Sequence, residues 1–300
     1  MSALFHDPLW PRAGDWPSAH DPAEASEPVD VALLGVPTWR TSLSATGAHA
    51  TPAAVREALR RYSPTLIGPP AVDLDAVLAI VDAGDVTEPD GDEGEARVRR
   101  AVCDLVTRGA LVVALGGDNA ATVPVARGAA AGGLVTLDAH LDLRDGRSNG
   151  SPVRRLVEDG LDPRRIVQIG IADFANSPAY LARAAKLGIT VITLDDARRR
   201  PAADLMAEAF SIAGDGAGGV HLDIDVDVCD RAVAPACPAS VPGGLSAHEL
   251  RTLVRAAGSS DALVSADIVE IDATADTDDG RTVRLAALCV LELLAGRATR

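Results

Sequence analysis

Short apolar segments recur along this chain, and apolar residues in the longer segments between them return every three or four positions. Apolar runs of roughly four to eight residues, rich in Val, Ile and Leu, are typical of strands buried on both faces of a parallel sheet. Such runs occur at residues 29–36, 78–84, 110–117, 134–140, 165–171, 189–195, 219–228 and 262–271. Helical spacing is found at residues 52–61, 94–108, 120–131, 177–187, 198–213, 246–257 and 281–297.

Strands that alternate with helices predict βαβ units and a sheet covered on both sides. We therefore expect an α/β fold of three layers, with a mostly parallel sheet of about eight strands and helices on both faces. No linker rich in Pro, Gly or Ser interrupts the alternation, so residues 29–300 are predicted to form a single domain. Residues 1–28 contain several prolines and no periodicity, which predicts an irregular N-terminal arm.

The composition narrows the classes of function. Hydrophobic residues make up 47% of the chain and aromatic residues only 3%, so the core must consist of Ala, Val, Leu and Ile. The net charge of −15 disfavours binding to nucleic acid or to an anionic membrane surface. The sequence has no long apolar stretch or signal peptide, so we expect a soluble, cytoplasmic protein. Its cysteines form no CxxC pair and are expected to be reduced and structural; they are Cys103, Cys229, Cys237 and Cys289.

Acidic residues and a histidine gather at the ends of two predicted strands. Asp138, His140 and Asp142 follow one run, and Asp225 and Asp227 end another. Because strand side chains alternate, each set is expected to project to one side, at the sheet edge where ligands bind. Clustered carboxylates repel unless cations neutralise them, and oxygen ligands with one imidazole favour an ion such as Mn²⁺. The alternative is a pair of solvated strand ends whose acids cap the following helices.

A third candidate is the Gly116-Gly117-Asp118-Asn119 segment, which ends another predicted strand and enters a helix. By itself this segment indicates a tight turn in which Asp118 or Asn119 caps the helix. Its position at a strand end, one strand before Asp138, makes a contribution to the same site the second interpretation.

Together these segments resemble the ureohydrolase superfamily of arginases, agmatinases and formimidoylglutamases over roughly residues 30–298. The superfamily motifs GGDH, DAHxD and SxDxD correspond here to GGDN (116–119), DAHLD (138–142) and DIDVD (223–227), with IVEIDATAD (268–276) as a fourth segment. The resemblance implies an arginase-like fold that holds two Mn²⁺ ions. One ion would be bound by Asn119, Asp138, Asp142 and Asp225, and the other by Asp138, His140, Asp225 and Asp227.

The same resemblance implies the chemistry. A hydroxide bridging the two ions would attack the substrate, Asp142 would assist proton transfer, and Glu270 would accept hydrogen bonds from the cationic amidine group. Asn119 stands where most relatives have His, and an amide oxygen is a weaker metal ligand than imidazole, so we predict that the first ion is bound less tightly. Asp223 stands where Ser or Thr is usual, for which the sequence offers no physical account.

Segments after DAHLD resemble formimidoylglutamases in particular: Arg144, the stretch around Asn149 to Val153, and IGIADFANSPAY (169–180). A guanidinium at position 144 would bind a carboxylate, which suits N-formimidoyl-L-glutamate with its two carboxylates. The alternative is a surface arginine paired with Asp145. Asn149, where arginases have a His proton shuttle, is a further substrate-binding candidate. Two weaker candidates for the role of Arg144 are Arg147 and Arg154.

The expected function is hydrolysis of the formimidoyl C–N bond of N-formimidoyl-L-glutamate to L-glutamate and formamide, in histidine degradation. An agmatinase or guanidinobutyrase that releases urea is the first alternative. A non-catalytic regulatory paralogue is the second, favoured by the absence of His at positions 119 and 149. The resemblance also implies a homo-oligomer, a trimer or hexamer. The sequence leaves open the role of residues 1–28, with the active-site mouth and a subunit interface as the two surfaces that they could cover.

Overall fold

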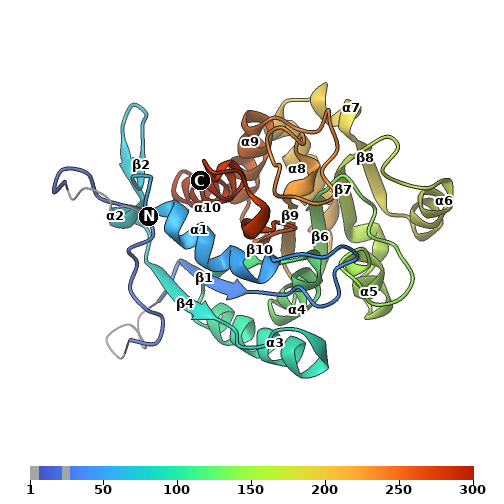
Figure 1. The fold of residues 1–300 in the computed structure, drawn as a ribbon, viewed down its shortest axis with the longest axis horizontal. Helices are drawn as coiled ribbons and strands as arrows, with labels where there is room; N and C mark the ends of the chain where they lie inside the picture. Colours follow the sequence, from blue (N-terminus) through green and yellow to red (C-terminus); the bar gives the residue numbers. More distant parts are fainter. Residues whose placement is uncertain (1–6, 22–27) are drawn as a thin grey trace.

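The computed structural model describes residues 7–21 and 28–300 and contains one eight-stranded sheet in which each paired neighbour is parallel (Figure 1). The order across the sheet is β4-β1-β5-β10-β9-β6-β7-β8. The predicted parallel sheet of about eight strands is thus confirmed. The strands are β1 (Val31–Val36), β4 (Ile80–Asp85), β5 (Leu111–Gly116), β6 (Gly133–Leu137), β7 (Ile166–Ile171), β8 (Thr190–Thr193), β9 (Val220–Asp225) and β10 (Leu263–Val269).

Each predicted helical segment contains a helix, although the boundaries differ. Pro201 caps the second of two helices where a single one was expected over 198–213. Two short helices, α2 and α5, and a two-stranded hairpin of β2 (Thr65–Leu66) and β3 (Val72–Asp73) were not predicted. The helices are α1 (Thr51–Leu59), α2 (Leu74–Val77), α3 (Gly91–Thr107), α4 (Thr122–Gly128), α5 (Pro152–Glu158), α6 (Pro178–Leu187), α7 (Leu194–Arg198), α8 (Ala202–Ala213), α9 (Ala247–Gly258) and α10 (Arg281–Ala298).

The sheet is the middle of three layers. Alternate residues of β9 (Val220, Leu222 and Ile224) pack into the core shared with α1, α8, α9 and α10. On the opposite face α3, α4 and α5 cover the strands, with smaller apolar clusters beneath them (Figure 1). The predicted helices on both faces are confirmed.

The strand order brings the four sequence motifs together. β5 and β6 follow each other in the chain, but β10 and β9 lie between them in the sheet. Their pairing places Leu137 beside Ile224, Asp225 beside Val269, and Ile268 beside Leu115. The carboxyl ends of β5, β10, β9 and β6 therefore meet at one crevice, at the point where the strand order reverses.

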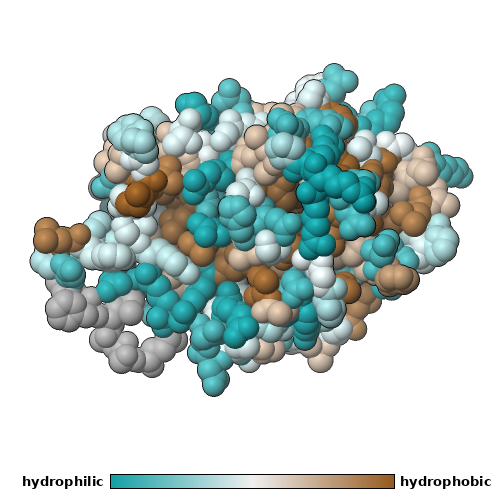
Figure 2. Space-filling model, turned by 90° about the horizontal axis from the view of Figure 1, so that it is seen from above, coloured by the Kyte–Doolittle hydropathy of each residue, from teal (hydrophilic) through white to brown (hydrophobic). Residues whose placement is uncertain are grey.

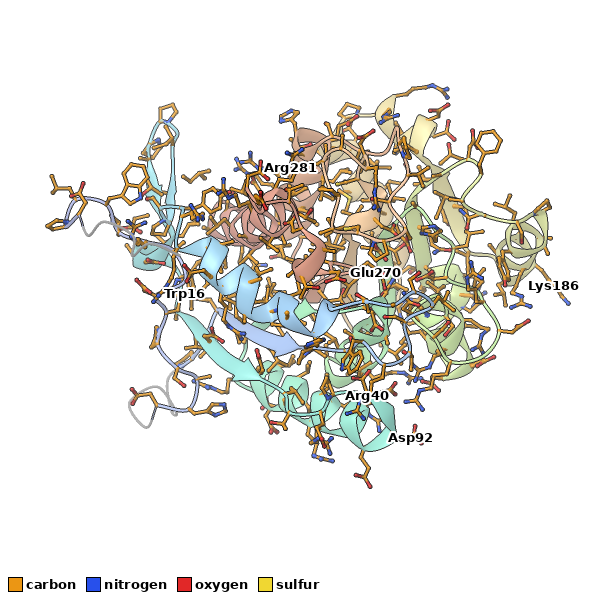
Figure 3. All side chains as sticks on the ribbon, in the orientation of Figure 1. Trp16, Arg40, Asp92, Lys186, Glu270 and Arg281 are labelled. Carbon is orange, nitrogen blue, oxygen red and sulfur yellow. The ribbon has the colours of Figure 1, made fainter. Side chains whose placement is uncertain are left out.

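The described part of the N-terminal arm lies along the outer edge of the sheet. Ala19 N donates to Asp82 O and Asp82 N to Pro17 O, both at 2.9 Å, so the arm pairs with part of β4. Trp16 Nε1 donates to Asp75 Oδ1 at 2.8 Å. In Figure 3, Trp16 is well separated from Glu270. Residues 7–21 thus protect an exposed strand edge, and of the two surfaces left open for the arm, the active-site mouth is not the one that these residues cover. Residues 1–6 and 22–27 of the predicted arm lie outside the described residues.

The surface mixes polar and apolar residues. On the face shown in Figure 2, hydrophobic patches are separated by hydrophilic ones. No helix in the described parts of the chain is long and apolar enough to cross a membrane. All four cysteines are free thiols, as predicted; Cys103 is exposed rather than part of the core.

Candidate metal centre

The backbone leaves strand geometry where the first motif begins. β6 ends at Leu137, and Asp138 Oδ1 accepts a hydrogen bond from His140 N at 2.6 Å, which turns the chain. Asp142 follows with a φ of 50°. The expectation that Asp138, His140 and Asp142 alternate along a strand is therefore wrong, and a side-chain-stabilised turn brings them together instead.

The second motif departs from the strand in the same way. β9 ends at Asp225, whose Oδ1 accepts from Asp227 N at 2.9 Å, and residues Val226–Val228 form a short 3₁₀ turn. Asp227 thus reaches the site through a turn rather than through strand alternation. Both carboxylates are almost completely buried.

Two overlapping groups of side chains have ligand atoms that lie within 4.8 Å of one another. One contains Asp138, His140 and Asp227, and the other contains Asp138, Asp142 and Asp225. His140 Nδ1 is 3.0 Å from Asp227 Oδ2 and 3.5 Å from Asp138 Oδ1. Asp138 belongs to both groups, as expected of a bridging ligand. The structure thus gathers these residues, and their individual roles as ligands stay predictions.

Asn119 completes the second group. The residue is fully buried, and its Nδ2 donates to Asp142 Oδ2 at 2.8 Å and to Asp225 Oδ2 at 3.1 Å. Its Oδ1 accepts from Thr122 Oγ1 at 2.5 Å. In this arrangement the amide NH₂ lies between two carboxylates, where a cation would otherwise be attracted. Ligation through Oδ1 would require the amide to rotate, with Nδ2 then donating to the Thr122 hydroxyl.

The Gly-Gly-Asp turn caps the helical segment that follows it, which is the first interpretation of its sequence. Asp118 accepts from Ala120 N at 3.2 Å and from Ser42 Oγ at 2.6 Å, so Asp118 is the cap. A Cβ on Gly117 would lie 2.0 Å from Thr38 O, so only glycine allows this close approach.

Burial and repulsion among neighbouring carboxylates dominate the electrostatics of the centre. Burial, then the charge of Asp227, raises the pKa of Asp138 to about 7 against the opposing effect of His140. Burial, together with Asp138, raises the pKa of Asp142, and burial with Asp227 raises that of Asp225. Burial opposes the charge of His140, but its hydrogen bonds with Asp138 and Asp227 outweigh this and raise its pKa to about 12.

These residues fit a pair of hard or borderline cations. Buried polar atoms normally have partners, yet Asp138 Oδ2 has none in the described structure. Carboxylate oxygens with one imidazole are the ligand set that Mn²⁺ accepts. Bound cations would also relieve the mutual repulsion that raises the carboxylate pKa values.

Glu270 lies beside the two groups, held by hydrogen bonds at Oε1. Asn119 N donates to this atom at 2.7 Å and Asn149 Nδ2 at 2.8 Å. Glu270 has a φ of 61° and its N–H is bonded to Gly117 O at 2.9 Å. Burial, then the charge of Asp118, raises its pKa to about 8. Asn149 thus positions Glu270 from within the pocket.

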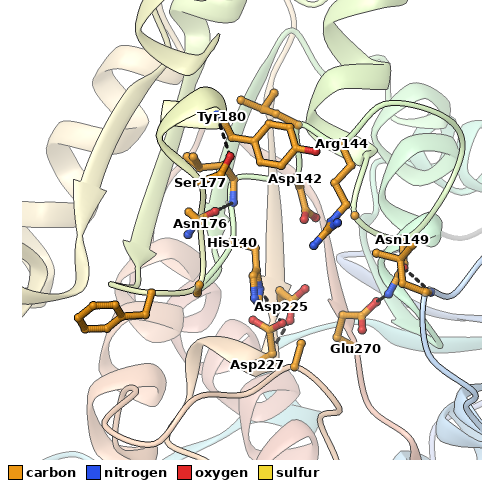
Figure 4. Close-up of a pocket in the computed structure, with 17 residues that line it drawn as sticks. His140, Asp142, Arg144, Asn149, Asn176, Ser177, Tyr180, Asp225, Asp227 and Glu270 are labelled. Carbon is orange, nitrogen blue, oxygen red and sulfur yellow. Dashed lines mark hydrogen bonds and ion pairs between the residues drawn. The ribbon is translucent and has the colours of Figure 1, made fainter. Parts of the chain in front are cut away.

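A cavity of about 360 Å³ opens over this centre, and Arg144 lines it (Figure 4). In this view the Arg144 side chain enters from above, and His140, Asp227 and Glu270 form the floor. No ion pair to Arg144 is found among the described residues. Its neighbour Asp145 pairs with Arg183 instead, at 2.8 Å. The predicted alternative, an Arg144–Asp145 surface pair, is therefore wrong.

Gly150 makes room for that side chain. A Cβ at Gly150 would lie 2.6 Å from Arg144 Cδ and 3.0 Å from Nε. Arg147 contacts Asp92 and Glu95, outside the pocket lining.

Arg154 is likewise engaged elsewhere. Its Nε donates to Arg144 O at 2.6 Å, and its guanidinium pairs with Glu158. Neither of these weaker candidates faces the cavity.

The segment between β7 and α6, together with the first turn of α6, supplies further pocket residues. Asn176, Ser177 and Tyr180 line the cavity, and Phe174 lies at its mouth with a fully exposed side chain and a φ of 64°. The only signal in the sequence was the likeness of residues 169–180 to formimidoylglutamases.

Asp223 is buried behind the centre, next to Asp225 along β9. It lies opposite Asp267 on β10 and opposite Thr136 on β6. Burial, then the charge of Asp267, raises its pKa. His221 Nε2 lies 3.3 Å from Asp267 Oδ2. The acid that replaces Ser or Thr thus belongs to a buried polar row rather than to the pocket lining.

Comparison with known proteins agrees with this geometry. The family model described as "Arginase family" matches residues 29–296. A formimidoylglutamase of Halalkalibacterium halodurans is 33% identical over 282 residues, which cover 89% of this chain and 87% of that protein.

Two solved structures show the same arginase-like fold. The formimidoylglutamase of Bacillus subtilis aligns with a TM-score of 0.90 and 28% identity, over 99% of this chain and 95% of that one. The formiminoglutamase of Trypanosoma cruzi, determined with Mn²⁺, aligns with a TM-score of 0.82 and 25% identity, over 91% and 94% of the two chains.

The raised pKa values predict how stability of the metal-free protein depends on pH. A group whose pKa is higher in the folded than in the unfolded state stabilises the fold at low pH and loses that contribution as pH rises through the folded pKa. Unfolded carboxyls lose their protons near pH ~4, whereas folded Asp138 keeps its proton to about 7 and folded Glu270 to about 8, so the unfolding temperature of chelator-treated protein should fall between pH ~4 and pH ~8. Stabilisation by added Mn²⁺ should grow over the same range, because metals bind deprotonated carboxylates. Differential scanning calorimetry with and without Mn²⁺ measures both, and a metal-free midpoint that rises with pH contradicts the prediction.

Asn119 predicts two unequal metal affinities. Mn²⁺ titration of the wild type should show a tighter and a weaker binding step, and metal-stripped enzyme should be less active than supplemented enzyme. Asn119→His should strengthen the weaker step, because imidazole is the better ligand, and Asn119→Ala should abolish it. Isothermal titration calorimetry of the three proteins checks this. Identical binding in all three would show that Asn119 is not a ligand.

Proposed function

Because the chain belongs to the arginase family of amidine hydrolases, we propose that it is a binuclear manganese enzyme that hydrolyses N-formimidoyl-L-glutamate. The products would be L-glutamate and formamide. The observation that carries the proposal is the Arg144 guanidinium, which has no ion pair with any described residue and lines the same cavity as the carboxylate cluster and Glu270. A cationic amidine and an anionic carboxylate on one small substrate match these two charges.

The residues divide the chemistry between them. Mn²⁺, when bound by Asn119, Asp138, His140, Asp142, Asp225 and Asp227, supplies a Lewis acid that makes a water nucleophilic near neutral pH. The Glu270 carboxylate, fixed through Oε1, accepts hydrogen bonds from the amidinium and orients its carbon toward the floor of the cavity.

Proton movement falls to Asp142. Water oxygen adds to the formimidoyl carbon, and the bond from that carbon to the glutamate nitrogen breaks. Asp142 takes the proton of the attacking water and delivers it to the departing nitrogen, which leaves formamide and the free amine of glutamate.

Arg144 favours this substrate over agmatine. A guanidinium makes charge-assisted, bidentate hydrogen bonds with a carboxylate but repels a cation. Agmatine has no carboxylate and two cationic ends, whereas formimidoylglutamate has two carboxylates. Guanidino acids, with one carboxylate and a planar cation, satisfy the same two groups, and their hydrolysis would release urea.

The decisive assay offers purified, Mn²⁺-loaded protein formimidoylglutamate, guanidinobutyrate and agmatine side by side. Formamide release with little urea is the expected result. Urea release without formamide would replace the proposed substrate by a guanidino compound. Protein that binds Mn²⁺ but turns over none of the three would favour the non-catalytic paralogue.

Arg144→Ala should raise KM for formimidoylglutamate roughly 10- to 100-fold, the loss expected from a hydrogen bond to a charged group. The effect on kcat should be smaller, because Arg144 binds the substrate away from the bond that breaks. Arg147→Ala is the matched control, since Arg147 contacts Asp92 and Glu95 outside the cavity. Equal KM values for the two variants would count against the role of Arg144. Steady-state kinetics of formamide release supplies the measurement.

A further inference from the structure

The segment that carries His140 has left the sheet, yet its peptide groups are hydrogen-bonded as if a strand still lay beside it. The last backbone hydrogen bond that this segment receives comes from Ala172, the residue after β7, whose N donates to Ala139 O at 3.0 Å. Beyond that point the partners of Ala139 and Leu141 are side chains.

Asn176 supplies the first of these partners. Its Nδ2 donates to Ala139 O and its Oδ1 accepts from Leu141 N, both at 2.9 Å. One carboxamide thus bonds the peptide groups on either side of His140, with the donor and acceptor pattern that a neighbouring strand would offer.

Gln168 supplies the second. This residue is fully buried on β7, and its Nε2 donates to Leu141 O at 3.1 Å. Leu141 is therefore held at both its N–H and its C=O by side-chain amides from two different places in the chain.

Asn176 is itself held in place. Its Nδ2 also approaches Ala172 O at 3.4 Å, which closes the segment on itself. Ser177, the next residue, caps α6 by accepting from Tyr180 N at 3.2 Å. The positive φ of Phe174 turns the chain within this segment.

We call these side-chain contacts of Asn176 and Gln168 with Ala139 and Leu141 the clamp. The clamp holds the backbone directly before Asp142, which has an unfavourable conformation. Asp142 has a φ of 50°, a conformation that a residue with a side chain keeps only when its surroundings enforce it. Ligand geometry at a metal depends on such outer contacts, whose loss typically weakens metal binding by roughly 10- to 100-fold.

We propose that Asn176, with Gln168 behind it, is a positioning residue that presets His140 and Asp142 for metal binding. The proposal rests on the metal site of the proposed function. It assigns to residues 172–177 a role in metal affinity, in addition to their place in the cavity wall.

The test compares Asn176→Ala and Asn176→Asp with Ser177→Ala. The aspartate keeps the shape and one acceptor oxygen but places a second oxygen against Ala139 O. Ser177→Ala removes a helix cap one residue away and leaves the clamp intact, so it controls for loosening of the loop. Gln168→Met preserves side-chain length and removes the donor to Leu141.

Two measurements separate a specific role of Asn176 in metal binding from a general loosening of the fold. Mn²⁺ titration should show that the tighter binding step is weakened roughly 10- to 100-fold in both Asn176 variants. Gln168→Met should weaken this step in the same direction, and Ser177→Ala should leave it unchanged. In metal-free protein, hydrogen exchange of the Leu141 amide should be faster in Asn176→Ala than in Ser177→Ala. Circular dichroism verifies that each variant is folded.

The outcomes distinguish the role of Asn176 from the metal centre on which that role rests. If wild type binds two Mn²⁺ and the Asn176 variants bind them with the wild-type affinity, the clamp proposal is overturned and the metal centre stands. Equal weakening in Ser177→Ala would assign the effect to the loop as a whole and overturn it as well. A wild type that binds no Mn²⁺ overturns the metal centre and the clamp together.

Discussion

Asp138, Asp142, Asp225, Asp227 and Glu270 are buried at the carboxyl ends of neighbouring strands, where charged carboxylates repel one another. Burial and this repulsion raise the pKa of Asp138 to about 7 and that of Glu270 to about 8. The fold can keep such a cluster only with protons, hydrogen-bond donors or cations among the oxygens. The amide of Asn119 and the ring of His140 lie among these oxygens as hydrogen-bonding groups.

The same region shows where the sheet stops determining the geometry. Parallel pairing brings β5, β10, β9 and β6 side by side, but the reactive side chains start just beyond the last ladder bonds. There, short side-chain hydrogen bonds from Asp138 and Asp225 to the backbone two residues ahead take over. The sheet provides coarse placement and side chains provide the final orientation, which is a general way to combine a rigid scaffold with a specific site.

The sequence predicted the strands well, because buried parallel strands leave continuous apolar runs such as Leu111–Gly116. It named acids that the structure does bring together, for a reason that was only half right. Alternation in DAHLD suggested a strand, whereas the chain turns at Asp138, and apolar periodicity carries no information on such local bonds. Arg144 shows a second limit: its nearest acid in sequence is Asp145, but Asp145 pairs with Arg183, which only the tertiary fold brings near. The clamp by Asn176 could not be predicted from the sequence either, because its contacts with Ala139 and Leu141 also depend on the tertiary fold.

Gly150 has a consequence for engineering. Because a Cβ there would lie 2.6 Å from Arg144 Cδ, the glycine and the arginine function as one unit. Grafting the arginine alone into a relative with a larger residue at the equivalent place would force the arginine side chain to shift from the position that it has here. A transfer of the role that we propose for Arg144 to another scaffold would therefore carry both positions, one of which contributes only space.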